Sequence, residues 1–232
     1  MEYDFAAGEI LLLNKPLDWT SFDVVKKVRN TLRVKKIGHA GTLDPLATGL
    51  LILCTGKYTK RIEEIQAQEK EYTGTIRLGE VTPSYDRETE VTERRDISGI
   101  TKESVVAAAK TFEGTIEQVP PIYSAVMVDG KRAYDLARKG KSAELKSRAI
   151  TIKAFEISAL EDAEVHFRVV CSKGTYIRSL AHDLGQLLGC GAHLSSLVRT
   201  RIGDYKLDDA LTVEDIQEIR KKLNEAANGS NS

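Results

Sequence analysis

One short segment constrains the fold of this 232-residue chain more than any other. Residues 38–49 read GHAGTLDPLATG, a run of small residues around one acid, Asp44, with apolar runs on both sides. Pro45 fixes the backbone after the acid and biases Asp44 away from helix, so we expect the carboxylate on a bend. Glycines at 38 and 41 should let a large flat ligand approach the backbone. Taken alone, an Asp before Pro more often hydrogen-bonds its own turn.

Length and composition indicate a globular protein of one large domain or two small ones. No apolar run approaches the ~18 residues that span a bilayer, and residues 1–4 lack the features of a secretion signal. The three cysteines, Cys54, Cys171 and Cys190, have no C-x-x-C spacing. We expect buried, reduced thiols in a cytoplasmic protein, and neither disulfides nor zinc ligands.

The charge distribution suggests an anionic partner although the net charge is zero. Positive residues gather in three stretches, each beside a glycine-rich or motif-like segment. The first holds Lys26, Lys27, Arg29, Arg33, Lys35 and Lys36; the second Lys131, Arg132, Arg138, Lys139, Lys141, Lys146 and Arg148; the third Lys173, Arg178, Arg199 and Arg201. One such stretch is usually a solvated face, but three together favour an anionic ligand.

The hydrophobic pattern predicts an α+β fold with a mixed sheet, because strands outnumber long helices without regular alternation. Strands are expected at 9–13, 50–54, 71–79, 149–160 and 165–171, and helices at 57–68, 104–112 and after Gly174. A further helix, capped by Thr20 or Ser21, should place Phe22, Val25, Val28 and Leu32 on its apolar side. The helix after Gly174 should bury Ile177, Leu180, Ala181, Leu184, Leu187 and Leu188.

Common cofactor motifs are absent from the sequence. Gly56-Lys57 fails as a phosphate-binding loop, because Leu51 and Tyr58 stand where that motif needs Gly and Ser or Thr. There is no dinucleotide fingerprint and no G-x-S-x-G elbow. We therefore expect no cofactor and no metal.

Six segments together resemble the TruB family of tRNA pseudouridine synthases. They are Lys15-Pro16, residues 38–49, Lys70-Glu71-Tyr72, residues 118–125 (QVPPIYSA), 130–134 (GKRAY) and 173–178 (KGTYIR). The resemblance runs from about Ile10 to Gly203. It implies a mainly antiparallel sheet flanked by helices, and isomerisation of uridine 55 in the tRNA T loop without cofactor. The implied partner is the T arm of tRNA, with no obligatory protein partner or guide RNA.

The resemblance also assigns the catalytic residues. Asp44 matches the catalytic aspartate, Arg178 the arginine that pairs with it, and Tyr72 the tyrosine that stacks on the target base. By residue type alone, Arg178 would be a surface residue at a helix start and Tyr72 a core-facing strand residue. An arginine beside Asp44 would keep the acid ionised.

Substrate-binding residues follow from the same resemblance. Tyr176 and Leu197 would line the uracil pocket, His39 would help displace the base, and Lys60 would contact phosphate. Lys15 is included among the substrate-binding residues because, together with Pro16, it is expected to support the active-site loop. Without the resemblance, Tyr176 and Leu197 would be core residues, His39 a turn residue and Lys60 a solvated surface lysine.

The implied chemistry needs one ionised carboxylate. Uracil must leave C1′ of its ribose, turn over and rejoin through C5. Asp44 could attack C1′ or remove the C2′ proton, and the sequence leaves both routes open. The target uridine must first swing out of the folded loop.

We expect a catalytic domain at 1–203 with a thumb-like insertion at about 120–148, then a short helix and polar tail at 204–232. Many family members carry an additional C-terminal RNA-binding domain, which we do not expect here. Two other functions remain open from the residues alone. A non-catalytic RNA-binding module would not need Asp44, Tyr72 and Arg178 together. A glycoside hydrolase would need a second carboxylate, which Asp86 or Glu88 could supply.

Overall fold

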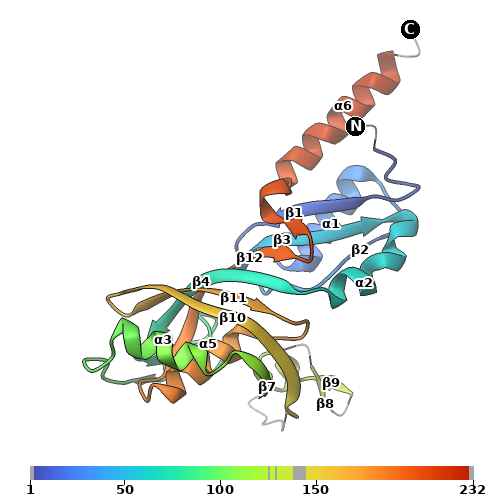
Figure 1. Ribbon diagram of the computed structural model, residues 1–232. Helices are drawn as coiled ribbons and strands as arrows, with labels where there is room; N and C mark the ends of the chain where they lie inside the picture. The colour runs from blue at the N-terminus through green and yellow to red at the C-terminus, as the bar shows by residue number, and fades with distance from the viewer. Residues whose placement is uncertain (1–2, 125, 129, 138–144, 230–232) are drawn as a thin grey trace. The chain divides into compact units, whose positions relative to one another are not determined.

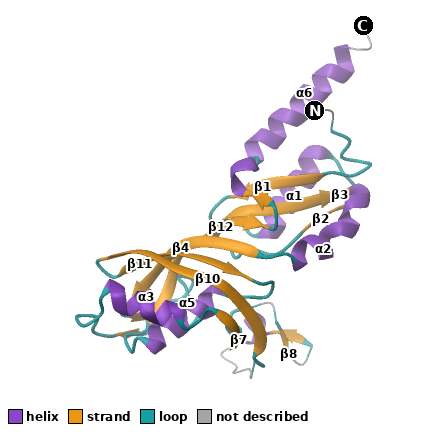
Figure 2. Ribbon diagram, viewed as in Figure 1, coloured by secondary structure: helices purple, strands orange, loops and turns teal. Residues whose placement is uncertain are grey.

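The computed structural model describes residues 3–124, 126–128, 130–137 and 145–229 (Figures 1 and 2). The chain divides into two compact units, residues 1–70 with 198–232 and residues 71–197. Parts of the predicted thumb and of the second basic stretch, including Arg138, Lys139 and Lys141, lie outside the described residues. The predicted boundary at residue 203 stays a prediction.

The first unit is a small sheet with helices on both faces. Its elements are β1 (Ile10–Lys15), α1 (Ser21–Leu32), β2 (Ile37–His39), β3 (Ala47–Thr55), the 3₁₀ helix η1 (Gly56–Arg61), α2 (Ile62–Ala67), the end of β12 (Ala192–Ile202), β13 (Tyr205–Lys206), η2 (Leu207–Asp209) and α6 (Val213–Gly229). β1 and β2 run antiparallel to β3, which neighbours β12, and β13 is antiparallel to β12. The strands expected at 9–13 and 50–54 are confirmed.

Strand β3 is an unbroken apolar run because both of its faces are covered. Leu51 and Leu53 pack in one core cluster with residues of α1 and α6, whereas Leu50, Ile52 and Cys54 pack in another with Ile65 of α2. Side chains alternate between faces along a strand, so burial on both sides selects apolar residues at every position. The strand is thereby fixed in the middle of the unit, and the Asp44 turn lies directly before it.

Helix α1 begins where the sequence predicts, but the side chains of its first residues point in other directions than expected. Thr20 is the N-cap and forms a capping box with Asp23. Val25, Val28 and Leu32 are buried as expected, but Phe22 is 69% exposed. The prediction for Phe22 is wrong because Ser21 takes the inward position, and the next residue on a helix points about 100° away.

The second unit contains strands of the main sheet, two separate two-stranded sheets and the helices α3, α4 and α5. Its elements are β4 (Lys70–Leu78), β5 (Glu80–Val81), β6 (Glu93–Arg94), α3 (Lys102–Lys110), β7 (Gly114–Gln118), β8 (Met127–Val128), β9 (Lys131–Arg132), α4 (Ala133–Ala137), β10 (Arg148–Glu161), β11 (Glu164–Cys171), α5 (Ile177–Leu187) and the start of β12. The strand order is β12-β4-β11-β10-β7, and β10 is antiparallel to both neighbours. Helix α3 packs on β10 and on α5 (Figure 1). The predicted α+β class with a mainly antiparallel sheet is confirmed.

Most of the predicted core of this unit is confirmed. Val165, Phe167 and Val169 of β11 are buried, as are Ile177, Leu180, Ala181 and Leu184 of α5. Leu187, however, is 56% exposed. Gly185 lies against the backbone of Gly191 and Ala192, where a Cβ atom would have no room. Two residues further along the helix, Leu187 points to the opposite side.

The three cysteines are buried and free, as predicted. Within the described ranges, no helix combines the length and the apolar character needed to cross a membrane.

Candidate active site

Asp44 lies on a tight turn, as the sequence predicts. The amide of Ala47 donates to the carbonyl of Asp44 at 3.0 Å, with the exposed Pro45 between them. Asp44 itself is partly exposed, whereas its neighbours Leu43 and Ala47 are buried. The turn therefore holds the acid at the surface of a rigid frame.

Arg199 braces this turn from inside the first unit. Its side chain is almost fully buried, and its Nε donates to the carbonyl of Leu50 at 2.7 Å. The two terminal nitrogens donate to the carbonyls of Gly41 and Thr42, at 3.1 and 3.3 Å. The sequence placed Arg199 among cations that face an anionic partner, and that placement is wrong. No sequence signal distinguishes this buried arginine from the partly exposed Arg201.

The glycines of the segment serve internal packing. Gly49 has a φ of 99°, and a Cβ atom there would lie 2.4 Å from the carbonyl oxygen of Arg199. A Cβ on Gly38 would lie 2.8 Å from Ile62 Cδ1. At Gly38 protein atoms therefore occupy the space in which a ligand was expected. A Cβ atom on Gly41 would lie 3.6 Å from the guanidinium of Arg199, and the approach of a ligand to Gly41 stays a prediction.

Lys15 supports the same turn from the end of β1. Its side chain is fully buried, and its ammonium donates to the carbonyls of Pro16, Trp19 and Pro45, at 2.8, 2.6 and 3.3 Å. Burial lowers the pKa of Lys15 to about 8, with the charge of Asp44 opposing the shift. At neutral pH the ammonium form still predominates and can serve all three acceptors.

Replacing Lys15 should weaken the frame of the turn. We expect Lys15→Met to lower the free energy of unfolding by about 1–3 kcal/mol, since it leaves partly buried carbonyl groups without their donor. Urea denaturation measures this. Lys60→Met, at an exposed lysine of the same unit, is the control and should stay within ~0.5 kcal/mol of the unchanged protein. Equal stability of both variants would contradict the supporting role.

Ser21 ties the start of α1 to the segment before Asp44. Its hydroxyl accepts a hydrogen bond from the amide of Leu43 at 2.9 Å and donates to the carbonyl of the same residue at 3.1 Å. We expect Ser21→Ala to cost about 1–3 kcal/mol of unfolding free energy, because the buried amide loses its acceptor. Ser98→Ala, on an exposed turn, should change this free energy by less than ~0.5 kcal/mol. A thermal melt that fails to separate the two variants would refute the role of Ser21.

The first unit also carries His39 and Lys60. His39 ends β2 and is half-buried, and burial lowers its pKa, so the imidazole is neutral at pH 7. Lys60 lies in η1 and is exposed, which leaves its ammonium accessible to a ligand.

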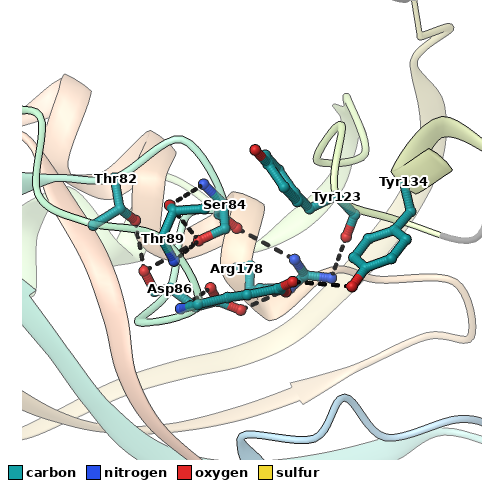
Figure 3. A network of polar contacts seen from close by, with 8 residues as sticks. Thr82, Ser84, Asp86, Thr89, Tyr123, Tyr134 and Arg178 are labelled. Carbon is teal, nitrogen blue, oxygen red and sulfur yellow. Dashed lines mark hydrogen bonds and ion pairs between the residues drawn. The ribbon is translucent and has the colours of Figure 1, made fainter. Parts of the chain in front are cut away.

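Arg178 is the centre of a polar network in the second unit (Figure 3). It lies in the first turn of α5, and only 4% of it is exposed. Its terminal nitrogens donate to the carbonyls of Ser84 and Tyr123, at 3.2 and 2.9 Å. Its Nε is 3.6 Å from Oδ2 of Asp86. The interpretation as a surface arginine is therefore wrong.

The loop of residues 82–89, which contacts Arg178, is stabilised by hydrogen bonds of its own (Figure 3). Thr82 donates to the carbonyl of Asp86 at 2.6 Å, and the hydroxyls of Ser84 and Thr89 lie 2.9 Å apart. Asp86 accepts the amide of Glu88 at 2.9 Å, and Glu88 accepts the hydroxyl of Tyr134 at 3.2 Å. Asp86, only 5% exposed, thus holds Arg178 in place.

Tyr176 is fixed as the N-cap of α5. The side chain of Gln118 accepts from its amide at 2.8 Å and donates to its carbonyl at 3.0 Å. The guanidinium of Arg148 lies 4.7 Å from the centre of its ring, a cation–π distance. Arg148, a member of the second basic stretch, therefore also helps to hold the ring of Tyr176 within the second unit.

The remaining predicted residues lie on strands of the second unit. Tyr72 of β4 is 8% exposed and shares the buried face with Ile76 and Leu78, as the alternation predicts. Leu197 of β12 is partly exposed. The predicted residues are therefore divided between the units: Asp44, Lys15, His39 and Lys60 belong to the first, and Tyr72, Tyr176, Arg178 and Leu197 to the second.

A polar pocket of about 350 Å³ lies in the second unit, and none of the predicted site residues lines it. Its lining includes Thr82 and Thr89, which also belong to the network around Arg178. Cations and acids face it together: Arg77, Arg87, Glu80, Glu90 and Glu164. Its mixed charge gives it no evident preference for a phosphate group.

Comparison with known families identifies the class. A family described as "TruB family pseudouridylate synthase (N terminal domain)" matches residues 29–177. A second, "tRNA pseudouridylate synthase B C-terminal domain", matches residues 178–229. The fold is thus that of the pseudouridylate synthases.

Similar proteins narrow the class. A protein of Phocaeicola vulgatus is 54% identical over 234 residues, which cover 96% of this chain and 100% of that protein. A protein of Parabacteroides distasonis is 56% identical over 222 residues, covering 93% and 94%. Both are named tRNA pseudouridine synthase B. The chain belongs to the TruB family. This assignment replaces the two alternatives that the residues alone left open, a non-catalytic RNA-binding module and a glycoside hydrolase.

Solved structures are similar over nearly the whole chain. An archaeal box H/ACA sRNP Nop10–Cbf5 complex matches with a TM-score of 0.71 and 28% identity, over 96% of this chain and 57% of the matched one. A Cbf5–Nop10–Gar1 complex matches with a TM-score of 0.72 and 32% identity, over 92% and 54%. This chain thus spans a little over half the length of those two proteins.

Proposed function

We propose that the protein isomerises uridine 55 in the T loop of tRNA to pseudouridine, with Asp44 as the catalytic carboxylate and no cofactor. The main observation in favour is the turn that carries Asp44. The buried side chains of Arg199 and Lys15 donate hydrogen bonds to backbone carbonyls of this segment, and Asp44 itself is partly exposed. Relatives more than 50% identical over most of their length are named tRNA pseudouridine synthase B, which supports the proposal.

The reaction breaks the bond between C1′ and N1 of uridine and forms one between C1′ and C5. Asp44 either attacks C1′ or removes the proton from C2′, and both routes need its ionised form. Arg178 pairs with Asp44 and stabilises this form. The contacts of Arg178 with Ser84, Tyr123 and Asp86 support the role, because they fix the guanidinium before substrate arrives.

The other residues receive the everted nucleotide. Tyr72 stacks on uracil and assists removal of the C5 proton, and Tyr176 and Leu197 line the pocket. His39 displaces the base, which suits a neutral imidazole beside an uncharged nucleobase. Lys60, exposed in η1, contacts a phosphate.

We further propose that the enzyme acts in the cytoplasm on the T arm alone, without a guide RNA or an obligatory protein partner. Residues 1–203 form the catalytic domain, and the region 120–148 serves as a thumb over the T loop. Within this region β8 pairs with β9, and α4 follows them; this local structure supports the proposal of a thumb. Tyr123 and Tyr134 pack edge to face there, 6.2 Å apart.

Mapping the product tests the proposal. Unmodified tRNA transcript is incubated with the purified protein and treated with a carbodiimide that marks pseudouridine, and the marked base stops reverse transcriptase. We expect one new stop, at uridine 55, and none in a transcript with cytidine there. A stop at other positions only, or no stop, would refute the proposed function.

A further inference from the structure

We propose that the exposed side of α1 is an additional RNA-binding surface, on which Phe22 stacks against an unpaired base and the following cations hold the adjoining phosphates. The inference rests on the proposed function. It adds a binding surface beside the catalytic turn that none of the predicted site residues includes.

Phe22 is unusual among the apolar residues of its helix. Val24, Val25, Val28 and Leu32 are buried, but Phe22 is 69% exposed, more than any other large apolar side chain of the described residues. An exposed aromatic ring offers a flat face on which any nucleobase can stack.

The cations of the first basic stretch continue the surface that Phe22 begins. Lys26 and Arg29 follow Phe22 by four and seven residues, and residues at this spacing lie on one side of a helix. Arg33, Lys35 and Lys36 come next along the chain. These five side chains are exposed, as is Lys27.

Little negative charge opposes these cations. From Ser21 to Leu43 the sequence holds one acid, Asp23, and its carboxylate accepts from the amide and the hydroxyl of Thr20 in the helix cap. Asp23 also interacts electrostatically with Lys26. An exposed ring followed by cations that far outnumber the acid of the same segment is the composition of a single-strand nucleic-acid surface. A protein partner would need a broader apolar area.

The surface begins at the catalytic turn. Ser21, the residue before Phe22, is bonded in both directions to the backbone of Leu43, the residue before Asp44. In the loop before α1, the amide of Asp18 donates to the carbonyl of Pro45 at 2.9 Å. An RNA whose uridine lies at Asp44 therefore has its neighbouring nucleotides within reach of Phe22.

Stacking is tested by the affinity for unmodified tRNA. We expect Phe22→Ala to weaken binding at least about fivefold, and Phe22→Tyr, which keeps a ring, to bind within about twofold of wild type. Leu187→Ala, at another exposed apolar residue, in α5, is the control and should bind as wild type. The single-turnover rate at saturating enzyme should be unchanged in all three variants.

Salt dependence tests the phosphate contacts. The double variant Lys26→Gln, Arg29→Gln should reduce the slope of log affinity against log salt by about 1.4–1.8, as for two lost phosphate contacts. The exposed pair Lys221 and Lys222 of α6 provides the matched control, and its double glutamine variant should keep the wild-type slope.

Three results would overturn the inference: wild-type affinity of Phe22→Ala, an equal loss in Phe22→Tyr, or a salt slope that the cation variant shares with its control. A change in self-association with tRNA affinity intact would mark the surface as a protein contact and also overturn the inference.

Failure of wild-type enzyme to modify tRNA would refute the proposed function. Normal modification with unaltered binding by these variants would refute this inference alone.

Discussion

Asp44→Asn should reduce pseudouridine formation by at least about 1,000-fold and leave tRNA affinity within about twofold of wild type. The amide keeps the size of the side chain and the turn, but it can neither attack C1′ nor accept the C2′ proton. Single-turnover assays with excess enzyme measure the rate, and filter binding measures the affinity.

The neighbouring Asp18 supplies the matched control for this variant. It is exposed and lies in the loop that bonds to Pro45, and its positive φ of 65° suits asparagine as well as aspartate. Asp18→Asn removes the same charge and should keep the rate within about threefold. Substantial turnover by Asp44→Asn would remove Asp44 from the central role.

Arg178→Met should abolish activity and also destabilise the fold. It leaves Asp86 as a buried carboxylate without its cation, which typically costs about 3–5 kcal/mol of unfolding free energy. Adding Asp86→Asn removes the unpaired charge, so the double variant should recover part of the stability but none of the activity. Urea denaturation and single-turnover assays separate the two effects.

Arg168→Met is the control for the loss of an arginine. Arg168 pairs with Glu71 and Glu156 at 2.7 and 3.0 Å, but its side chain is 41% exposed, so its loss should cost less than ~1 kcal/mol. Wild-type activity in the double variant would show that Arg178 only supports the fold.

The sequence predicted those features that local patterns determine. Pro45 and the small residues around Asp44 define a turn whatever packs beneath it, and the apolar run 50–54, short and followed by Gly56, favours a buried strand. The sequence offers Thr20 or Ser21 as the cap of α1, and the structure selects Thr20, which forms a capping box with Asp23.

Features that depend on distant contacts could not be predicted. Phe22 is exposed and Ser21 is buried because the backbone of Leu43, more than 20 residues further on, bonds the serine. Arg199 and Arg178 look like surface cations in the sequence. They are buried because carbonyl groups of loops far along the chain converge on each guanidinium.

Tritium release from tRNA labelled at C5 of uridine tests the central claim most directly, because forming the new bond at C5 expels that hydrogen. We predict about one equivalent of tritium per tRNA with wild-type enzyme, and none with Asp44→Asn or with a transcript that carries cytidine at position 55. Release by Asp44→Asn, or from the cytidine transcript, would contradict the account.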